Sequence, residues 1–443
     1  MPTVLIDSVP FKHGLFGPAL SDAVVRIKTA KIITKSRTND LLKSIKAADP
    51  VAAAHFRDEL INGPDARLVS AIVANKKLRP DRRQTLEKCL LVPTLLDLSK
   101  PLTELVPVYP KAKKSGGVRM IHNFGLLHRT SQDMVSRVMG VYYKPRYFQF
   151  TERGVHAAVK SAKAALGAGH VHVARLDIEN FYPSFDPEKL ASELPLPQEV
   201  VDNVVLGRHM KVVMDQEQKV SHAGSSLPHT LNDLLLLARL GIPLGSASSP
   251  IVASHRVSQL MWLHRDGVTL VNYADDFLLL SSSVKLLDKA VGGLTAVVAK
   301  LPGGHFELIL KATSDAMNGF DFLGHSIRIV AGKLITSPTE ANTNHIWMKI
   351  TEIDEQLSNL VYAVGKNGKY DKQKALTLLA RMLAIVDGWS SAFSECDDPK
   401  QMVEPLICGV KEWAAKLEVS PDQIKQAIEP YMEYKPVDYA LGH

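Results

Sequence analysis

Two adjacent carboxylates, Asp275 and Asp276, are the residues of this chain best suited to chemistry. They stand at the polar centre of residues 268–280, between two apolar runs, and this pattern is typical of a β-hairpin with the acidic pair at its turn. Neighbouring like charges repel each other, and a bound divalent cation is the usual compensation. Considered alone, the pair favours the plainer interpretation of a solvated surface turn, since Asp is a common turn residue.

A third carboxylate and a loop of small residues change that balance. Asp177 ends an apolar, strand-like run at 171–178, where an unpaired carboxylate would be costly. The Gly/Ser-rich loop 241–250 lies between the acidic elements; such a loop often does no more than precede a helix, but its small residues also let the backbone approach a ligand closely. Further on, a predicted strand at 306–310 leads into Lys311. Carboxylates from separate elements suit two-metal phosphoryl transfer, so the sequence predicts that chemistry.

Basic residues precede the acidic elements. Residues 106–121 read as strand, basic glycine turn and strand, and basic residues interleaved with aromatic ones continue to Arg153. Such a stretch can hold phosphates and stack bases, and an equally good interpretation is a solvated basic face with the aromatics in the core. The basic residues singled out are Lys111, Lys113, Lys114, Arg119, Arg129, Arg137 and Arg146.

Composition is that of an ordinary globular protein, and the positive net charge alone is only a weak indication of a polyanionic partner. The chain has 443 residues, 46% hydrophobic and 22% charged, with a net charge of +7. No apolar run approaches the roughly 20 residues of a membrane span, and the N-terminus does not resemble a signal peptide. The three cysteines have neither zinc nor disulfide spacing, which suits a reducing cytoplasm. We therefore expect a cytoplasmic protein with no membrane partner.

The elements needed to position these residues can be predicted in outline. Residues 1 to about 100 are expected to be helical, and so is the chain from Pro338 to its end. The other predicted elements are a helix at 154–166, an N-cap at Asp186 with Pro187 following, a helical region at 197–240, a helix from Pro250 to about Gly267, a helix at 284–300, and a hairpin of 320–330 with 333–336.

The order of these features resembles that of reverse transcriptases with a right-hand polymerase fold, over about residues 105–395. Tyr273-Ala274-Asp275-Asp276 resembles the Tyr-x-Asp-Asp motif, and Asp177 with Phe181-Tyr182 is similar to the first palm motif. Residues 244–250 stand in the place of the Gln-Gly-x-x-x-Ser-Pro motif, and Phe322-Leu323-Gly324 resembles the segment before the primer grip. The helix with Gly388-Trp389 is similar to the thumb of bacterial enzymes.

The resemblance implies an α+β right-hand polymerase with helical N-terminal and C-terminal regions. It implies a helical extension at 1–100, fingers at 101–165 and 195–240, a palm with an antiparallel sheet at 166–194 and 241–338, and a helical thumb and C-terminal region at 339–443.

The resemblance also implies roles for individual residues. Asp177, Asp275 and Asp276 would bind Mg²⁺ or Mn²⁺, and Lys311 would protonate pyrophosphate. Tyr182 would exclude the ribose 2′-hydroxyl, a case of specificity by steric rejection. The remaining implied nucleotide contacts are Lys111, Lys113, Lys114, Arg119, Leu244, Gly245 and Tyr273, and the implied nucleic-acid contacts are Arg129, Arg137, Arg146 and Gly324.

One departure from the family pattern leaves alternatives open. Leu244 stands where most retroviral, group II intron and retron enzymes carry Gln, and the zinc-finger, HNH and retron thumb signatures are absent. The remaining pattern is similar to bacterial abortive-infection and defence-associated reverse transcriptases. The implied partners are an RNA template, such as a dedicated non-coding RNA, a DNA product and dNTPs; a homo-oligomer is left open. The alternatives are untemplated or protein-primed synthesis at the same site, and a catalytically silent RNA-binding scaffold.

Overall fold

The computed structural model describes residues 2–7, 9–113, 116–215, 230–263, 266–367, 370–397 and 399–432. The protein contains both helices and strands, and its chain divides into two compact units. The first unit holds Met1–Gln149, Asp177–Leu263 and Gly293–Ile309. The second holds Phe150–Leu176, His264–Gly292 and Leu310–His443. Each unit is therefore assembled from segments that lie far apart in the sequence.

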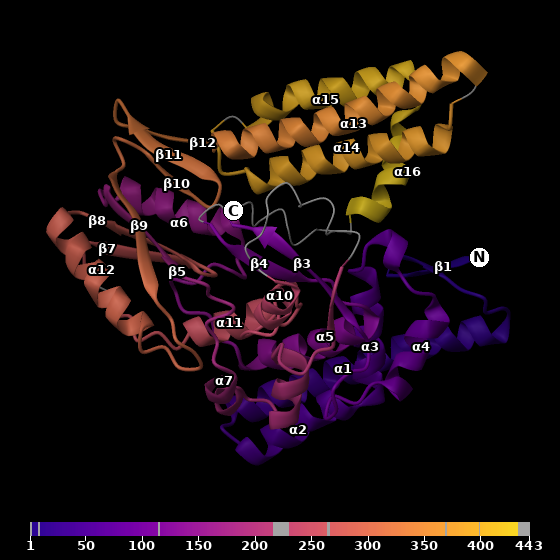
Figure 1. Ribbon diagram of the computed structural model, residues 1–443, viewed down its shortest axis with the longest axis horizontal. Coiled ribbons are helices and arrows are strands. Elements are labelled where there is room, and N and C mark those ends of the chain that lie inside the picture. The colour runs from indigo at the N-terminus through magenta and orange to yellow at the C-terminus, as the bar shows by residue number, and fades with distance from the viewer. Residues whose placement is uncertain are drawn as a thin grey trace. The chain divides into compact units, whose positions relative to one another are not determined.

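Helices dominate the first unit. They are α1 (Pro18–Lys46), α2 (Pro50–Asn62), α3 (Pro64–Lys76), α4 (Leu86–Leu95), α5 (Leu126–Tyr142), α7 (Pro187–Glu193), α8 (Gln198–Val200), α10 (Leu231–Leu237) and α11 (Ser249–Val257). Helix α3 packs against α1, α4 and α5, in the indigo-to-purple part of the chain in Figure 1. Helix α2 begins where Asp49 accepts hydrogen bonds from the backbone of Val51 and Ala52, with Pro50 at the first helical position.

A small sheet of the first unit carries the predicted basic turn. Strand β3 (Val106–Ala112) pairs antiparallel with β4 (Val118–His122) and parallel with β6 (Val212–Met214), and a separate hairpin of β1 (Thr3–Ile6) with β2 (Val9–Lys12) begins the chain. Alternate residues of β3 are buried, as expected of a strand with one face on the core. That core also takes Phe124 from the turn before α5 and Leu234 from α10.

The second unit is built around a four-stranded sheet in the order β7-β8-β5-β9. Its strands are β5 (His172–Ile178), β7 (Val268–Tyr273), β8 (Asp276–Ser281) and β9 (Leu308–Asp315). Helix α6 (Val155–Gly167) packs on β7 and β8, and its Ala158, Val159 and Ala162 share a core with Val271 and Leu278. The last two residues of β5 and the first two of β9 are counted with the first unit, and α12 (Val284–Val298) runs from the second unit into the first.

A second sheet and a helical bundle complete the second unit. Strands β10 (Phe320–Phe322), β11 (His325–Val330) and β12 (Lys333–Pro338) form the sheet. The bundle consists of α13 (Glu340–Asn367), α14 (Lys372–Ala392), α15 (Pro399–Lys416) and α16 (Pro421–Met432), drawn in orange to yellow in Figure 1. Ile353, Leu379 and Trp413 belong to its apolar core. Among the described residues, no helix is long and apolar enough to cross a membrane.

The structure confirms most of the predicted elements and corrects four. The N-terminal region begins with the β1–β2 hairpin before its helices. The region 197–240 contains the short helices α8 and α10, a π-helical turn at Val201–Val205 and strand β6, while 216–229 lie outside the described residues. Helix α11 ends at Val257, well before Gly267, and Met261 beyond it is exposed. The predicted strand 320–330 is broken at Leu323-Gly324, where both residues have positive φ and the chain reverses between β10 and β11.

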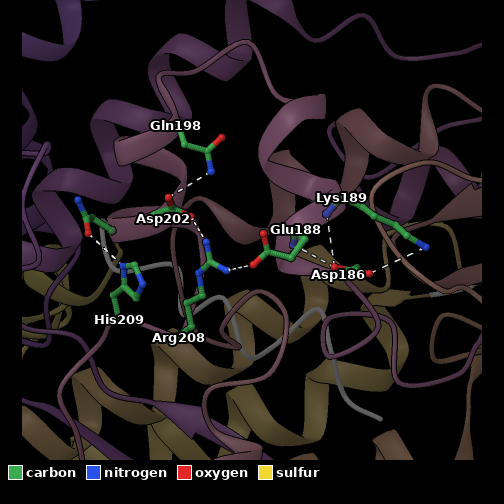
Figure 2. Close-up of polar contacts among 8 residues, drawn as sticks. Asp186, Glu188, Lys189, Gln198, Asp202, Arg208 and His209 are labelled. Carbon is green, nitrogen blue, oxygen red and sulfur yellow. Dashed lines mark hydrogen bonds and ion pairs between the residues drawn. The ribbon is translucent and has the colours of Figure 1, made fainter.

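Polar contacts fix the N-terminal end of helix α7 (Figure 2). Asp186 caps it by accepting hydrogen bonds from the backbone of Glu188 and Lys189, which confirms the predicted cap. Arg208 pairs with both Glu188 and Asp202, and so joins α7 to the π-helical turn. These contacts hold the helix that follows the Asp177–Phe185 segment.

Candidate active site

The acidic pair lies at the tip of the β7–β8 hairpin, as predicted. Tyr273 and Asp276 are the last paired residues, so Ala274 and Asp275 form the two-residue connection. Ala274 has φ of 53°, a left-handed conformation that a non-glycine residue adopts at a cost on the order of 1 kcal/mol or more. A turn of this kind keeps its shape only if its surroundings hold it.

Asn272 and Thr151 hold the tip. The Asn272 side chain, 1% exposed, donates one amide hydrogen to the Ala274 carbonyl at 2.9 Å and another to the Asp276 carbonyl at 3.1 Å. The Thr151 hydroxyl accepts a hydrogen bond from the Ala274 backbone at 2.9 Å, and the Phe150 backbone N–H donates to the Asn272 carbonyl at 2.9 Å. Both sides of the strained residue are therefore fixed by partly buried hydrogen bonds.

The two carboxylates at the tip suit a hard divalent cation. Asp275 and Asp276 are half-buried, and carboxylate oxygens are the ligands that Mg²⁺ prefers. Among the residues that the structure describes, no cluster of three or more His, Cys, Asp or Glu side chains that could hold a metal ion is formed. The pair therefore fits part of a cation site, and the full ligand set stays a prediction.

Tyr273 takes part in packing. Its side chain is 9% exposed and belongs to the core beneath the sheet, with Val173, Leu278 and Phe320. Burial raises the pKa of the Tyr273 hydroxyl, because the charged phenolate is disfavoured away from water. This packing fixes the first residue of the tip, and the predicted nucleotide contact of Tyr273 stays a prediction.

Asp177 lies on the next-to-last residue of β5, as predicted, and is half-buried. The segment that follows it is anchored within the first unit, where the backbone of Glu179 donates to the Glu307 carbonyl at 2.9 Å. Phe181 and Phe185 pack against Phe306, with ring centroids 5.7 and 5.0 Å from it. These contacts fix the backbone around Tyr182, whose half-buried ring lies 5.6 Å from that of Phe181.

The predicted basic turn joins β3 to β4 in the first unit. Lys111 and Arg119 are directly opposite each other in the register, so their positive charges lie on neighbouring strands. Lys113 donates a hydrogen bond to the side chain of Asn180, which brings it to the segment between Asp177 and Tyr182. Lys114 lies outside the described residues.

The Gly/Ser loop is held by buried polar groups. The backbone N–H of His122 donates to the Leu244 carbonyl at 3.0 Å, and the His122 ring faces the carbonyls of Leu244 and Ala238 at 3.1 and 2.8 Å. On the other side, Gln132 accepts a hydrogen bond from the backbone N–H of Ala247 at 3.1 Å. Burial lowers the pKa of His122, although the hydrogen bonds to the two carbonyls act in the opposite direction. The ring is therefore neutral at pH 7, and its two nitrogens carry one N–H for two carbonyl acceptors.

Lys311 and Gly324 lie in the second unit, with the acidic tip. Lys311 is an exposed residue of β9. Gly324 has φ of 81°, and a Cβ there would lie 2.6 Å from the Asn342 amide, which donates to the Gly324 carbonyl at 3.1 Å. The turn thus ties the β10–β11 connection to the start of α13, and its role toward nucleic acid stays a prediction.

The three predicted RNA-binding arginines have different surroundings in the first unit. Arg129 is half-buried on α5. Arg137 pairs with Asp133 at 3.1 Å, and Lys77 shares that carboxylate at 3.5 Å. Arg146 is exposed and donates through Nε to the Ser258 carbonyl at 2.8 Å. Arg137 is partly neutralised, so Arg146 has the surroundings that best suit a phosphate contact.

The predicted residues are thus distributed over both units. The first unit holds Asp177, the basic hairpin, Tyr182 and the Gly/Ser loop, and the second holds Tyr273, Asp275, Asp276, Lys311 and Gly324. The supporting residues Asn272, Thr151, His122 and Gln132 were not predicted. A polar Asn within an apolar strand was a signal that could have found Asn272; the other three become evident only from the fold.

Comparisons with known proteins yield structural neighbours of low similarity. No protein-family profile and no curated protein sequence matches the chain. Apo telomerase from Candida tropicalis is 12% identical with a TM-score of 0.40, covering 77% of this chain and 63% of that one. Telomerase from Candida albicans, in a complex with a fragment of telomeric RNA, is 10% identical with a TM-score of 0.35, covering 75% and 66%. The Sicinivirus 3Dpol RNA-dependent RNA polymerase is 12% identical with a TM-score of 0.34, covering 55% of each chain.

The chain spans less than two thirds of the length of each of these neighbours. TM-scores of this size do not establish a shared fold, so an account of function depends on the residues described above.

Proposed function

We propose that the chain is an RNA-directed DNA polymerase that joins deoxynucleotides by two-metal nucleotidyl transfer. The observation that carries the proposal is the Asp275-Asp276 pair on a hairpin tip held in a strained conformation by Asn272 and Thr151. Backbone strain that the surrounding structure holds in place clusters at functional sites. A plain solvated turn would not require this support.

The proposed ligand set includes Asp177. Its strand, β5, lies beside β8 in the four-stranded sheet, and Asp276 is the first residue of β8. When bound, Mg²⁺ or Mn²⁺ would supply charge neutralisation at the attacking and leaving oxygens. The carboxylates would orient the ions, and Lys311 would give a proton to the departing pyrophosphate.

The first unit would hold the incoming nucleotide. Lys111 and Arg119, opposite each other on the β3–β4 hairpin, provide paired positive charges for a triphosphate. Lys113, bonded to Asn180, brings a further cation to the segment that carries Tyr182. The aromatic packing of Phe181 would fix the neighbouring backbone, so that the Tyr182 ring could exclude a ribose 2′-hydroxyl.

The template and the biological setting are proposed from the resemblance in sequence alone. We propose a dedicated non-coding RNA as template and bacterial antiphage defence in the cytoplasm as the setting. Synthesis without a template is the second candidate, favoured by Leu244: its half-buried apolar side chain has no group that could bond a template base or nucleotide.

The test of the proposed activity is incorporation of labelled dNTPs by the purified protein, with and without the RNA that co-purifies with it. Incorporation that requires the RNA and follows its sequence supports templated synthesis. Incorporation that persists after complete nuclease digestion supports the second candidate, and absence of incorporation with every primer and divalent ion contradicts both.

RNA binding can be tested separately from synthesis. Neutralising Arg129, Arg137 and Arg146 together should weaken RNA retention more than neutralising the exposed C-terminal lysines Lys411 and Lys416. Phosphate contacts weaken with salt, so the slope of affinity against salt should also fall for the arginine variant. If both variants lose affinity only in proportion to the charge removed, the arginines form no specific site.

A further inference from the structure

The backbone segment 238–245, which leads from the end of α10 into the Gly/Ser loop, is bonded to two other parts of the first unit. His122 contacts both ends of the segment: its ring faces the Ala238 carbonyl at 2.8 Å, and its backbone N–H donates to the Leu244 carbonyl at 3.0 Å. In the middle, the backbone N–H of Ile242 donates to the Tyr182 carbonyl at 3.0 Å. The segment therefore connects the end of β4 with the backbone of Tyr182.

Two glycines show how close these approaches are. Gly241 has φ of 57°, and a Cβ there would lie 2.0 Å from the Tyr182 carbonyl oxygen. Gly245 has φ of 94°, and a Cβ there would lie 2.6 Å from the His122 carbonyl oxygen. Both distances are shorter than real Cβ atoms tolerate. The backbone can therefore come this close to Tyr182 and His122 only because glycine has no side chain at either position.

The connected parts are those to which the proposed function assigns nucleotide binding. Strand β4 carries Arg119, the Gly/Ser loop contains Leu244 and Gly245, and Tyr182 is the proposed sugar gate. His122 is buried, so a change in its side chain acts through the segment that it contacts.

Resting on the proposed function, we propose that His122 is a positioning residue: it fixes segment 238–245 between β4 and Tyr182, and thereby sets nucleotide affinity and sugar selection. Removing its ring would free the Ala238 end of the segment and loosen the Leu244 end. The consequence would be weaker nucleotide binding and poorer rejection of ribonucleotides, with a smaller change in the rate of the chemical step.

The chain provides a matched control in His128. Both histidines are buried, and both lie against Phe124, with ring centroids 5.6 Å from its ring. The His128 ring also faces a backbone carbonyl, that of Glu104 at 3.1 Å, but the described contacts of His128 do not include segment 238–245. His122→Phe and His128→Phe therefore remove similar buried bonds, and only the first frees the segment.

The experiment compares the two Phe variants with the unaltered chain at equal folded fraction. For His122→Phe we expect KM for dNTP to rise about tenfold and the dNTP-over-rNTP ratio of kcat/KM to fall, since the loss of one buried hydrogen bond corresponds to about that factor. His128→Phe should leave both quantities unchanged. His122→Gln keeps a side-chain amide donor and should recover part of the loss. Equal KM values and equal sugar ratios for the two Phe variants would overturn the proposal.

Gly245→Ala serves if His122→Phe does not fold. It leaves the histidine in place and pushes the loop away from the His122 backbone, so it should raise KM and lower the sugar ratio in the same way. Unchanged values in a folded Gly245→Ala protein would overturn the proposal.

Hydrogen exchange separates this inference from the proposed function. The backbone amides of segment 238–245 should exchange faster in His122→Phe than in His128→Phe, whether or not the protein incorporates dNTPs. Absence of incorporation by the unaltered chain would reject the polymerase assignment alone, and equal exchange in the two variants would reject the role of His122 alone.

Discussion

Asn272→Asp tests whether the acidic tip depends on its buried support. The substitution keeps the shape of the side chain and replaces the amide nitrogen, 2.9 and 3.1 Å from two carbonyl oxygens, with an oxygen. Two hydrogen bonds are lost, at about 0.5–1.5 kcal/mol each, and the carbonyls left unsatisfied add about 1–3 kcal/mol. We expect the free energy of unfolding to fall by about 2–6 kcal/mol in total at pH 8.

The sign of the pH dependence makes this prediction specific. The new carboxyl would be almost fully buried, so its folded-state pKa lies above its unfolded value. An acid of this kind costs stability as the pH rises above the unfolded pKa, and its protonated form regains one donor. The variant should therefore be closer to the unaltered protein at pH 5 than at pH 8 in urea denaturation.

Activity should fall with the support of the tip. A misplacement of about 1 Å at a reacting centre can lower the reaction rate about a hundredfold. We therefore expect kcat/KM per folded molecule to drop roughly 10- to 100-fold. Asn203→Asp is the matched control, since Asn203 is a buried residue of the first unit whose amide donates to the Leu98 carbonyl. The reasoning is refuted if Asn272→Asp keeps normal stability and normal kcat/KM at pH 8.

Two further predictions concern sugar choice and acid stability. Tyr182→Ala should lower the dNTP-over-rNTP ratio of kcat/KM by admitting ribonucleotides, and an unchanged ratio in an active variant would show that Tyr182 is not the gate. Burial, and then the neighbouring charge of Arg256, lower the pKa of His255 from 6.5 to about 4. The neutral, buried His255 ring therefore contributes its full stability above about pH 6.5, and this contribution is lost as the pH falls toward 4. At pH 5 the loss should be about 2 kcal/mol, measured by urea denaturation as the difference in unfolding free energy between pH 7 and pH 5. If a folded His255→Gln protein shows the same difference between the two pH values, His255 does not cause the loss of stability.

The sequence predicted the parts of the site that depend on local pattern. The apolar runs on both sides of Asp275-Asp276 predicted the hairpin, and the observed register of Tyr273 with Asp276 confirms the turn. Asp186 with Pro187 predicted the start of α7 for an equally local reason. In each case the pattern of a few neighbouring residues determines the structure.

What depends on distant parts of the chain could not be predicted in this way. His122 contacts Leu244 and Ala238, more than a hundred residues away, and Thr151 contacts Ala274 across a similar separation. The break at Leu323-Gly324 also escaped prediction, although Gly324, His325 and Ser326 interrupt the apolar residues there. Such contacts arise from tertiary packing, which overrides local propensity.

The central claim is that Asp275 and Asp276 carry out nucleotidyl transfer. Its most direct test is incorporation of labelled dNTPs by the unaltered protein and by the double variant Asp275→Asn/Asp276→Asn, with Asp321→Asn, an exposed aspartate on β10, as the charge control. We predict that the unaltered protein and the control incorporate dNTPs in the presence of Mg²⁺ or Mn²⁺ and stop when the ion is chelated. The folded double variant should be slower by at least about a thousandfold, because several kcal/mol of transition-state stabilisation are lost. Incorporation by the double variant at the rate of the unaltered protein would contradict the account.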